Sequence, residues 1–559
     1  MQAPESSPRS FAARLSASRD QVWHLALLLV LACVYHAAYT RAGLNLMDEG
    51  WPLSAARALH LGGTMYDQVF WVFPPGHVLA AWLGWAIDPP GQLIARWVYS
   101  FFDIALVVTL YFLARRVLPS HFALLAGLLL VVAAPDSHRA QGLFAYRYLV
   151  WSALALLCFD ARLRGGSRHW LFAAGALLAV AACFRTTPAF AAGCAIGFGV
   201  IFSTSHCGGW GGWRDWIRDW LAFGAGIAVF LAPVLVWFQY TVGLAAVWDN
   251  VFVRAVVMTA EQAKPIPDIV LPDAWGLRLQ VKLWFIALQF RLHPLVYTVY
   301  TLALGVLWLR AVRRRERFEH VLLFAIVIWG ALFFVRSLGR SDWAHLDSAV
   351  PPMCLLGAHA LWLGLGVVPW PAAGAPRRVM RAAGGLALLA AWVFLLGSDL
   401  PLRSGPSGRP THELRTSQGP IYVAASRTAR RLDSRLNSIR KWTDRSQTIL
   451  DLSASPGFHA LADRDGPGYL DLIIPGTFLE PGEEEEFLAR LRRAPPALVV
   501  WPSQPFDRSR LRGLEFVAPR VSAWVLENYR PKGGDDGRWV LMLPHAVSDD
   551  MDSFVRSGR

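Results

Sequence analysis

The sequence has few charged residues: 17% are Asp, Glu, Lys or Arg, whereas an ordinary soluble domain carries about 25%. Hydrophobic residues make up 55% of the 559 positions, and the mean hydropathy is +0.36. No sequence repeat is present, and the apolar residues gather in blocks. This composition excludes an ordinary soluble globular protein and predicts a polytopic integral membrane protein.

Cysteine is also scarce, with six residues in the chain and none after residue 354. All six lie in or beside apolar blocks, and their spacing is not that of metal ligands. No disulfide framework can therefore hold the C-terminal region, and we expect the cysteines to be small apolar packing residues. They are Cys33, Cys158, Cys183, Cys194, Cys207 and Cys354.

About eleven apolar blocks approach the roughly 20 residues that a helix needs to cross the hydrocarbon core. We expect the first block to be retained as a helix, because no small-residue cleavage site followed by a soluble chain marks it as a signal peptide. The predicted transmembrane helices lie at 22–40, 93–113, 121–134, 148–160, 169–184, 188–203, 220–240, 285–309, 320–335, 350–368 and 382–398.

The net charge of +14 could suit a nucleic-acid partner, but its distribution argues against one. Much of the Arg lies in short segments between apolar blocks, which is the positive-inside pattern of membrane proteins. With these clusters inside, residues 1–21 form a cytoplasmic tail, residues 22–400 a membrane domain and residues 401–559 an extracytoplasmic domain. Long outer loops then cover 41–92 and 241–283.

The first outer loop contains two short helical segments, at 52–61 and 76–87. The second is apolar but too short to cross a membrane, so we expect both to lie on the outer surface. Ser54, Arg57 and His60 recur at three-residue spacing, which predicts that one face of the first segment is solvated.

The region after residue 402 alternates short apolar runs with charged stretches typical of helices, and this predicts an α/β domain. It has no glycine-rich phosphate loop and no His/Cys cluster. We predict strands at 421–424, 448–452, 470–474, 497–501 and 539–543, and helices at 428–442, 483–493 and 521–528. Asp463, Asp465 and Asp471 could bind a cation, but a solvated loop is the preferred interpretation.

Candidate chemistry lies in the predicted outer loops. Asp48 and Glu49 follow the first helix, and the alternative is that they form only a polar helix end or an N-cap. Other ionisable side chains share this side of the membrane: Arg340, His345, Arg185, Asp136, Arg147 and His77. Cations can neutralise a lipid-phosphate leaving group, and a carboxylate can activate an acceptor hydroxyl. Transporters also use such groups, so these residues alone do not decide the function.

The order of these features resembles that of the GT-C membrane glycosyltransferases, in particular the protein-mannosyltransferase and aminoarabinose-transferase group (family 39 and its relatives). The resemblance covers about residues 20–400. It rests on Asp48-Glu49 after the first helix, Pro74-Pro75 before the second surface segment, and a late outer loop with Arg340 and His345 before Pro351-Pro352.

The resemblance implies an all-α GT-C-like membrane domain and inverting transfer of a sugar from a polyprenyl-phosphate donor to a lipid, glycan or protein acceptor. Asp48 would be the general base and Glu49 would orient it. Arg340 and His345 match the loop that meets the lipid phosphate, and Arg185 stands where relatives have a Lys. Some relatives elsewhere in the superfamily need a divalent metal, which Asp48, Glu49 and Asp136 could hold, but this branch usually manages without one, so no metal or other cofactor is expected.

One feature departs from the family pattern. Relatives often have a second acid a few residues after an Arg-Tyr pair, but Arg147-Tyr148 is followed here by no acid. Asp136 is the remaining candidate for that role. The resemblance further implies a bacterial inner-membrane protein whose partners are the lipid-linked donor, the acceptor and membrane lipids, without nucleic acid.

Two other function classes remain open at this point. A transporter or flippase of lipid-linked glycans should show inverted repeats and broken helices at the membrane midplane. A non-catalytic membrane scaffold that displays the C-terminal domain would leave the candidate residues scattered in space.

Overall fold

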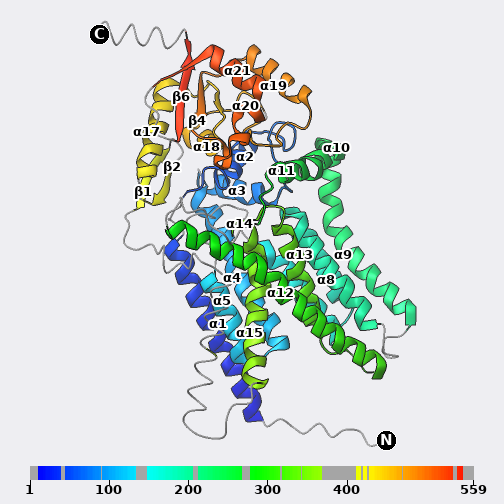
Figure 1. The fold of residues 1–559 in the computed structure, drawn as a ribbon. Coiled ribbons are helices and arrows are strands. Elements are labelled where there is room, and N and C mark those ends of the chain that lie inside the picture. The colour runs from blue at the N-terminus through cyan, green and yellow to red at the C-terminus, as the bar shows by residue number, and fades with distance from the viewer. Residues whose placement is uncertain are drawn as a thin grey trace, which may run out of the picture.

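The structure, a computed structural model, describes residues 11–39, 44–89, 91–133, 148–204, 212–266, 277–314, 316, 318–341, 343–367, 385, 411–416, 419–424, 427–468, 470–532 and 538–545. Figure 1 shows a long helical bundle with the C-terminal domain seated on one end. Short helices of the outer loops lie between the two.

The bundle helices of the described residues coincide with the predicted apolar blocks. They are α1 (Phe11–Tyr39), α4 (Gln92–Val117), α5 (Ser120–Ala133), α6 (Leu149–Leu163), α7 (His169–Phe184), α8 (Thr186–Thr204), α9 (Gly212–Thr241), α12 (Leu277–Arg314), α13 (Val321–Ser337) and α15 (Val350–Val367). The last predicted helix, 382–398, lies outside the described residues except for Gly385.

Four of the described helices are long and apolar enough to cross a membrane, judged by length and composition. They contain the spans Arg19–Ala37, Gln92–Val117, Arg214–Thr241 and Ile286–Arg314. The other bundle helices are apolar but shorter. The helical membrane domain is thus confirmed in outline, and the count of about eleven crossings stays a prediction.

Small residues let the bundle helices approach closely. A Cβ atom at Gly175 of α7 would collide with the carbonyl oxygen of Phe223 on α9, and one at Gly226 of α9 with that of Phe172. Glycine at both positions therefore allows the two backbones to touch, as small residues do between membrane helices.

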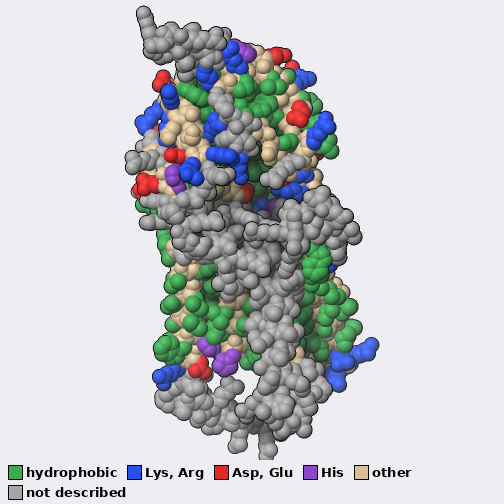
Figure 2. All heavy atoms as spheres, turned by 60° about the vertical axis from the view of Figure 1, so that its left-hand side comes forward, with side chains coloured by type: hydrophobic (Ala, Val, Ile, Leu, Met, Phe, Trp, Pro, Cys, Tyr) green, Lys and Arg blue, Asp and Glu red, His purple; other side chains and the backbone are tan. Residues whose placement is uncertain are grey.

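Buried carboxylates gather Arg side chains at the end of the bundle away from the C-terminal domain. Asp160 of α6 pairs with Arg116 at 3.1 Å and with Arg164 at 2.8 Å. Asp219 of α9 pairs with Arg162 at 3.0 Å, and with Arg168 at 3.1 Å. Figure 2 shows the corresponding pattern on one face, where hydrophobic side chains cover the bundle and charges gather toward its ends.

The first outer loop forms the two predicted helices, α2 (Gly50–His60) and α3 (Gly76–Ile87). The predicted solvated face of α2 is wrong: Ser54 and Arg57 are buried, and of the three polar residues only His60 is exposed. The C-terminal domain covers this face, which sequence spacing cannot foresee. The later loops form α10 (Leu244–Trp248), the π-helix η2 (Asp249–Arg254), α11 (Ala255–Glu261), α14 (Trp343–Leu346) and the short 3-10 helix η3 (Asp347–Ala349).

The C-terminal region is an α/β domain, as predicted. Its main sheet has the order β3-β4-β6-β5, with β3 and β4 parallel and the other neighbours antiparallel, and β1 and β2 form a separate hairpin. The strands are β1 (Thr411–Thr416), β2 (Gly419–Ala424), β3 (Ile449–Asp451), β4 (Leu498–Pro502), β5 (Tyr529–Pro531) and β6 (Trp539–Pro544).

The helices of this domain are α17 (Arg427–Trp442), α18 (Gly457–Ala462), α19 (Pro481–Arg493), η4 (Phe506–Arg508), η5 (Arg510–Arg512), α20 (Leu514–Val517) and α21 (Pro519–Asn528). The predicted strand at 470–474 is wrong, because its apolar residues are buried in an irregular segment without a strand partner. Burial of apolar side chains explains that run without any sheet pairing.

The outer loops and the C-terminal domain share one apolar core. Trp51, Phe70 and Met258 of the loops belong to the same buried cluster as Ile473 and Leu488 of the domain. The domain is therefore packed onto the loops that carry the candidate residues, and it is not a separate body on a linker.

Candidate active site

Asp48 lies in a tight turn that Asn45 organises. The side-chain oxygen of Asn45 accepts hydrogen bonds from the backbone N–H groups of Met47 and Asp48, each at 3.0 Å. Its side-chain nitrogen donates to Oδ2 of Asp48 at 2.6 Å. An Asn side chain that bonds to the next residues of the chain fixes such a turn. Asn45 thus orients the half-buried Asp48 carboxylate, a role that the sequence did not reveal.

Glu49 is buried and paired with Arg96 of α4. Nε of Arg96 donates to Oε1 at 2.5 Å and Nη2 to Oε2 at 2.8 Å. Both side chains are 3% exposed. This two-point ion pair fixes the turn that contains Glu49 to α4 of the bundle. This geometry fits an orienting role for Glu49, and Arg96 is a partner that sequence reasoning missed.

Arg185 caps the end of α7, where the chain turns to an extended conformation. Its guanidinium lies over the ring of Phe73, 4.7 Å from the centroid, and Nη1 is 3.5 Å from the Tyr148 hydroxyl. Phe73 in turn contacts the ring of Trp51 on α2 with centroids 6.0 Å apart. Two ring contacts thus connect Arg185 to the helix that follows Asp48.

His77 is fully buried near the start of α3. Its Nδ1 is 3.0 Å from the Tyr99 hydroxyl, and the rings of Tyr148 and Phe184 surround it. Burial, together with the charge of Arg185, holds the pKa of His77 well below its usual range. His77 is therefore a neutral packing residue that fixes α3 against the bundle.

A second cation, Arg336 at the end of α13, was not among the predicted site residues. Its Nη1 donates to Oγ of Ser348 at 2.9 Å. The charges of Arg185 and Arg336 both act on the Tyr148 hydroxyl, and Arg185 lies 3.5 Å from it. The structure therefore brings Arg185 and Arg336 close to the same tyrosine. The sequence of the late outer loop does not reveal this proximity.

Arg340 faces the C-terminal domain. It donates to both carboxylate oxygens of Asp507, at 3.2 and 2.9 Å, and to Oε1 of Gln262 at 2.8 Å. His345 lies on α14 and is partly buried. Both Arg340 and the Asp48 turn touch the C-terminal domain, so the structure places them at the same end of the bundle. Asp136 and Arg147 lie outside the described residues.

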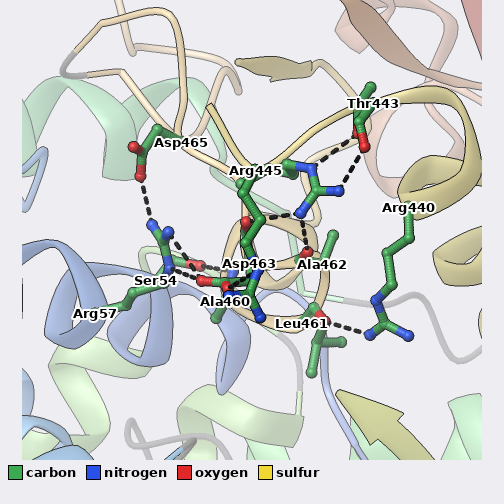
Figure 3. A network of polar contacts seen from close by, with 11 residues as sticks. Ser54, Arg57, Arg440, Thr443, Arg445, Ala460, Leu461, Ala462, Asp463 and Asp465 are labelled. Carbon is green, nitrogen blue, oxygen red and sulfur yellow. Dashed lines mark hydrogen bonds and ion pairs between the residues drawn. The ribbon is translucent and has the colours of Figure 1, made fainter. Parts of the chain in front are cut away.

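The three acids of the C-terminal domain do not form a solvated loop. Asp463 is buried and accepts from Nε of Arg57 at 3.1 Å, while Asp465 accepts from Nη1 of the same side chain at 2.5 Å (Figure 3). Burial raises the pKa of Asp471 to about 7. Only Asp465, at 62% side-chain exposure, is solvated as predicted.

The described residues contain no group of three or more His, Cys, Asp or Glu side chains arranged to hold a metal ion. Independence from metals and other cofactors stays a prediction.

Comparison with solved structures identifies proteins that share the fold of this chain. The chain is similar to ArnT from Cupriavidus metallidurans bound to undecaprenyl phosphate, with 16% identity, a TM-score of 0.53, and coverage of 93% of this chain and 97% of that chain. The apo state of that protein matches with a TM-score of 0.50. The oligosaccharyltransferase of Archaeoglobus fulgidus matches at 12% identity, a TM-score of 0.51, and 86% and 70% coverage.

No protein-family model matches the sequence. No curated protein matches it either. The structural neighbours are GT-C superfamily members, so the chain has the GT-C fold that the resemblance predicted.

Proposed function

We propose that this protein is a membrane glycosyltransferase that moves a sugar from a polyprenyl-phosphate donor to an acceptor at the end of the bundle that carries the C-terminal domain. The proposal is supported by the GT-C fold and by the turn at residues 45–49, which presents an oriented carboxylate there. ArnT from C. metallidurans, which shares the fold, binds undecaprenyl phosphate.

Asp48 is the general base of this proposal. As the acceptor hydroxyl attacks the anomeric carbon, its proton passes to the Asp48 carboxylate, and the bond to the lipid phosphate breaks with both electrons on the phosphate oxygen. Attack opposite the leaving group inverts the anomeric centre. Asn45 and the Glu49–Arg96 pair hold the base in position, and this preorganisation lowers the cost of reaching the reactive geometry.

The departing phosphate needs positive charge. Arg185 contacts Tyr148 at the end of α7, and Arg336 contacts Ser348 at the end of α13. A lipid carrier between the bundle helices would present its head group there. Arg340 and His345 are the other proposed phosphate contacts. Arg340 would have to exchange Asp507 for the phosphate to take this role.

The test is sugar transfer by Asp48→Asn in reconstituted membranes, with lipid extracts as the source of donor and acceptor. We expect transfer to be lost while insertion and thermal stability are unchanged. Asp67→Asn is the matched control, because Asp67 is an exposed acid in the same loop. Transfer by Asp48→Asn at the wild-type rate would remove the proposed base.

The transporter alternative is favoured by one observation. His36 of α1 lies 3.8 Å from Asp103 near the middle of α4, and both are buried. Ionisable pairs inside a membrane often mark transport pathways. The test measures movement of a fluorescent lipid-linked sugar across the bilayer of vesicles that contain the protein. Loss of this movement in Asp103→Asn but not in Asp48→Asn would support the transporter over the enzyme.

A further inference from the structure

A cavity of about 220 Å³ lies between the Asp48 turn and the C-terminal domain. Met47, the residue directly before the proposed base, forms part of its wall. The rest of the wall comes from the segments after β3 and β4, from Ile473 and Ile474, from Arg512 of η5 and from α20. The cavity therefore lies beside the proposed base and is built mostly by the domain that the proposed mechanism does not otherwise use.

The position of the cavity in the sheet favours ligand binding. β3 and β4 are parallel neighbours, paired from Ile449 with Leu498 to Asp451 with Val500. Residues 452–454 and 504–507, which line the cavity, follow the carboxyl ends of these strands. In open, mostly parallel α/β sheets, ligands bind in the crevice outside the carboxyl ends of the strands, and β3 and β4 form the one parallel pair of this sheet.

The backbone of the wall is also unusual. Ala454 has φ +53° and Asp507 has φ +55°, a conformation that residues other than glycine rarely adopt. Both line the same cavity. Backbone held in such regions costs about 1–3 kcal/mol and tends to occur at functional sites.

Three cations hold Asp507 in this conformation. Its carboxylate is 3.0 Å from Nζ of Lys264, 2.9 Å from Arg340 and 3.1 Å from Arg512. Lys264 and Arg340 belong to the membrane domain, and Arg512 also lines the cavity. The wall at this point is therefore fixed by contacts from both parts of the chain.

The wall chemistry indicates the ligand. Ser453, Gln504, Asp507 and Arg512 supply a hydroxyl, an amide, a carboxylate and a guanidinium, while Leu452, Ile473 and Phe506 supply apolar surface. Sugar hydroxyls both donate and accept, so they can satisfy an acceptor carboxylate beside donor groups. A phosphate only accepts, so it could use Arg512 but not the acceptor oxygens of Gln504 and Asp507. The volume is below the roughly 300–1,000 Å³ of sites for larger ligands, which fits a single sugar ring.

We propose that this cavity binds a sugar ring of the acceptor, so that the acceptor of the proposed transferase is a glycan. Its polar wall would hold the ring by the hydroxyl groups while the ring's apolar face lies against Ile473 and Phe506. The assignment of the bound sugar as the acceptor rests on the proposed function. The binding itself does not require turnover and can be measured without it.

The test uses the full chain in lipid nanodiscs without donor. Saturation-transfer NMR is recorded with methyl glycosides of glucose, mannose, galactose and N-acetylglucosamine, with inorganic phosphate and with an acetylated Gly-Ser peptide amide in separate samples. We expect at least one glycoside to bind. Gln504→Ala should weaken that binding by about 2- to 10-fold, as for one lost hydrogen bond, and Gln504→Trp should block the cavity.

Asn437→Ala is the matched control, because it removes an exposed amide from α17, which does not line the cavity. It should bind like the wild type. Binding of phosphate only, of the peptide only, of no probe, or equal glycoside binding by Gln504→Trp would each overturn the proposal.

The two proposals fail separately. Asp48→Asn should still bind the glycoside, since Asp48 is absent from the cavity wall. Transfer that depends on Asp48 without any glycoside binding would remove the cavity proposal alone. The opposite result is also possible: Gln504→Trp blocks glycoside binding, but Asp48→Asn transfers sugar at the wild-type rate. That result would support the cavity proposal and contradict the role of Asp48 as the base.

Discussion

Arg57 and Asp463 are 406 positions apart in the sequence, and Nε of Arg57 donates to Oδ1 of Asp463 at 3.1 Å. Each side chain is only 10% exposed. Nearby, Oγ of Ser54 donates to the carbonyl oxygen of Pro456 at 2.5 Å and accepts from the N–H of Ala460 at 3.3 Å. Figure 3 shows the contacts of Arg57 with Asp463 and of Ser54 with Ala460, between α2 and the α18 segment. The helix that follows Asp48 is therefore fastened to the C-terminal domain by buried polar contacts.

Arg57→Ala should loosen the C-terminal domain from α2, because it leaves two carboxylates without their shared partner. Breaking one side of a buried ion pair costs about 3–5 kcal/mol. We expect faster amide hydrogen exchange in residues 50–60 and 457–462, together with slower sugar transfer.

Arg445→Ala is the control for this variant. Arg445 also lies near Asp463, at 3.4 Å, but it is 69% exposed, and exposed pairs are worth about 0–1 kcal/mol. Exchange in Arg57→Ala that matches this control would show that the pair does not hold the domain in place.

Gly50→Ala should disturb the same interface by another route. An added Cβ at Gly50 would lie 2.6 Å from Cα of Gly457, and backbone cannot yield as a flexible side chain does. We expect slower transfer and a lower melting temperature. Gly482→Ala, which adds a Cβ in open space at the start of α19, should leave both unchanged. A fully active, stable Gly50→Ala protein would contradict the close approach of the two segments.

Arg96→Lys should slow transfer while leaving the KM for the donor unchanged. A lysine cannot reproduce the two-point pair with Glu49, so the turn that carries Asp48 loses its fixed position. Small displacements of catalytic groups can cost about 10- to 100-fold in rate. Steady-state kinetics would measure this effect.

Arg116→Lys is the control on the same helix, since Arg116 lies at the opposite end of α4 and is 41% exposed. Its kinetics should match the wild type. An increase in donor KM in Arg96→Lys, with kcat unchanged, would instead assign Arg96 to donor binding.

The contribution of Asp451 to the stability of the C-terminal domain should fall as the pH rises from about 4 to 7. Burial raises the pKa of Asp451 to about 7, so the folded domain binds its proton more tightly than the unfolded chain does. The stabilisation is complete below the unfolded value near 3.8 and is lost as the pH passes through about 7. Asp471 acts in the same direction.

Hydrogen exchange of residues 449–502 over this pH range would measure the change. Asp451→Asn keeps an oxygen that can accept from Ser453 but cannot ionise, so its pH dependence should be smaller. Asp444→Asn is the exposed control. A pH dependence in Asp451→Asn equal to that of the wild type would contradict the protonated state of Asp451.

The prediction of the fold succeeded where the signal is local. Each described bundle helix coincides with an apolar block, because backbone groups in lipid must bond within their own helix. α17, α19 and α21 carry charged or amphipathic patterns that also act within one segment. The run at 470–474 was predicted wrongly because burial in a shared core and burial in a strand leave the same apolar sequence.

The candidate site was predicted less completely. Asp48 and Glu49 were proposed from their place after the first helix and Arg185 from its place at a helix end, and their roles stay predictions. Arg96 and Asn45 were missed, because an Arg within an apolar helix and an Asn before an acidic pair have no distinctive pattern. The role of Arg340 also depends on Asp507, which the sequence gives no reason to connect with it.

The sequence by itself determined that this is a helical membrane protein with an α/β domain at its C-terminal end, because hydropathy and charge act over stretches of about 20 residues. Only the tertiary structure decided that Arg57 and Ser54 of α2 face that domain instead of water, and that a cavity lies between the domain and Met47. These features depend on contacts between residues more than 400 positions apart. Such contacts stabilise the fold without producing a recognisable pattern in the sequence of either segment.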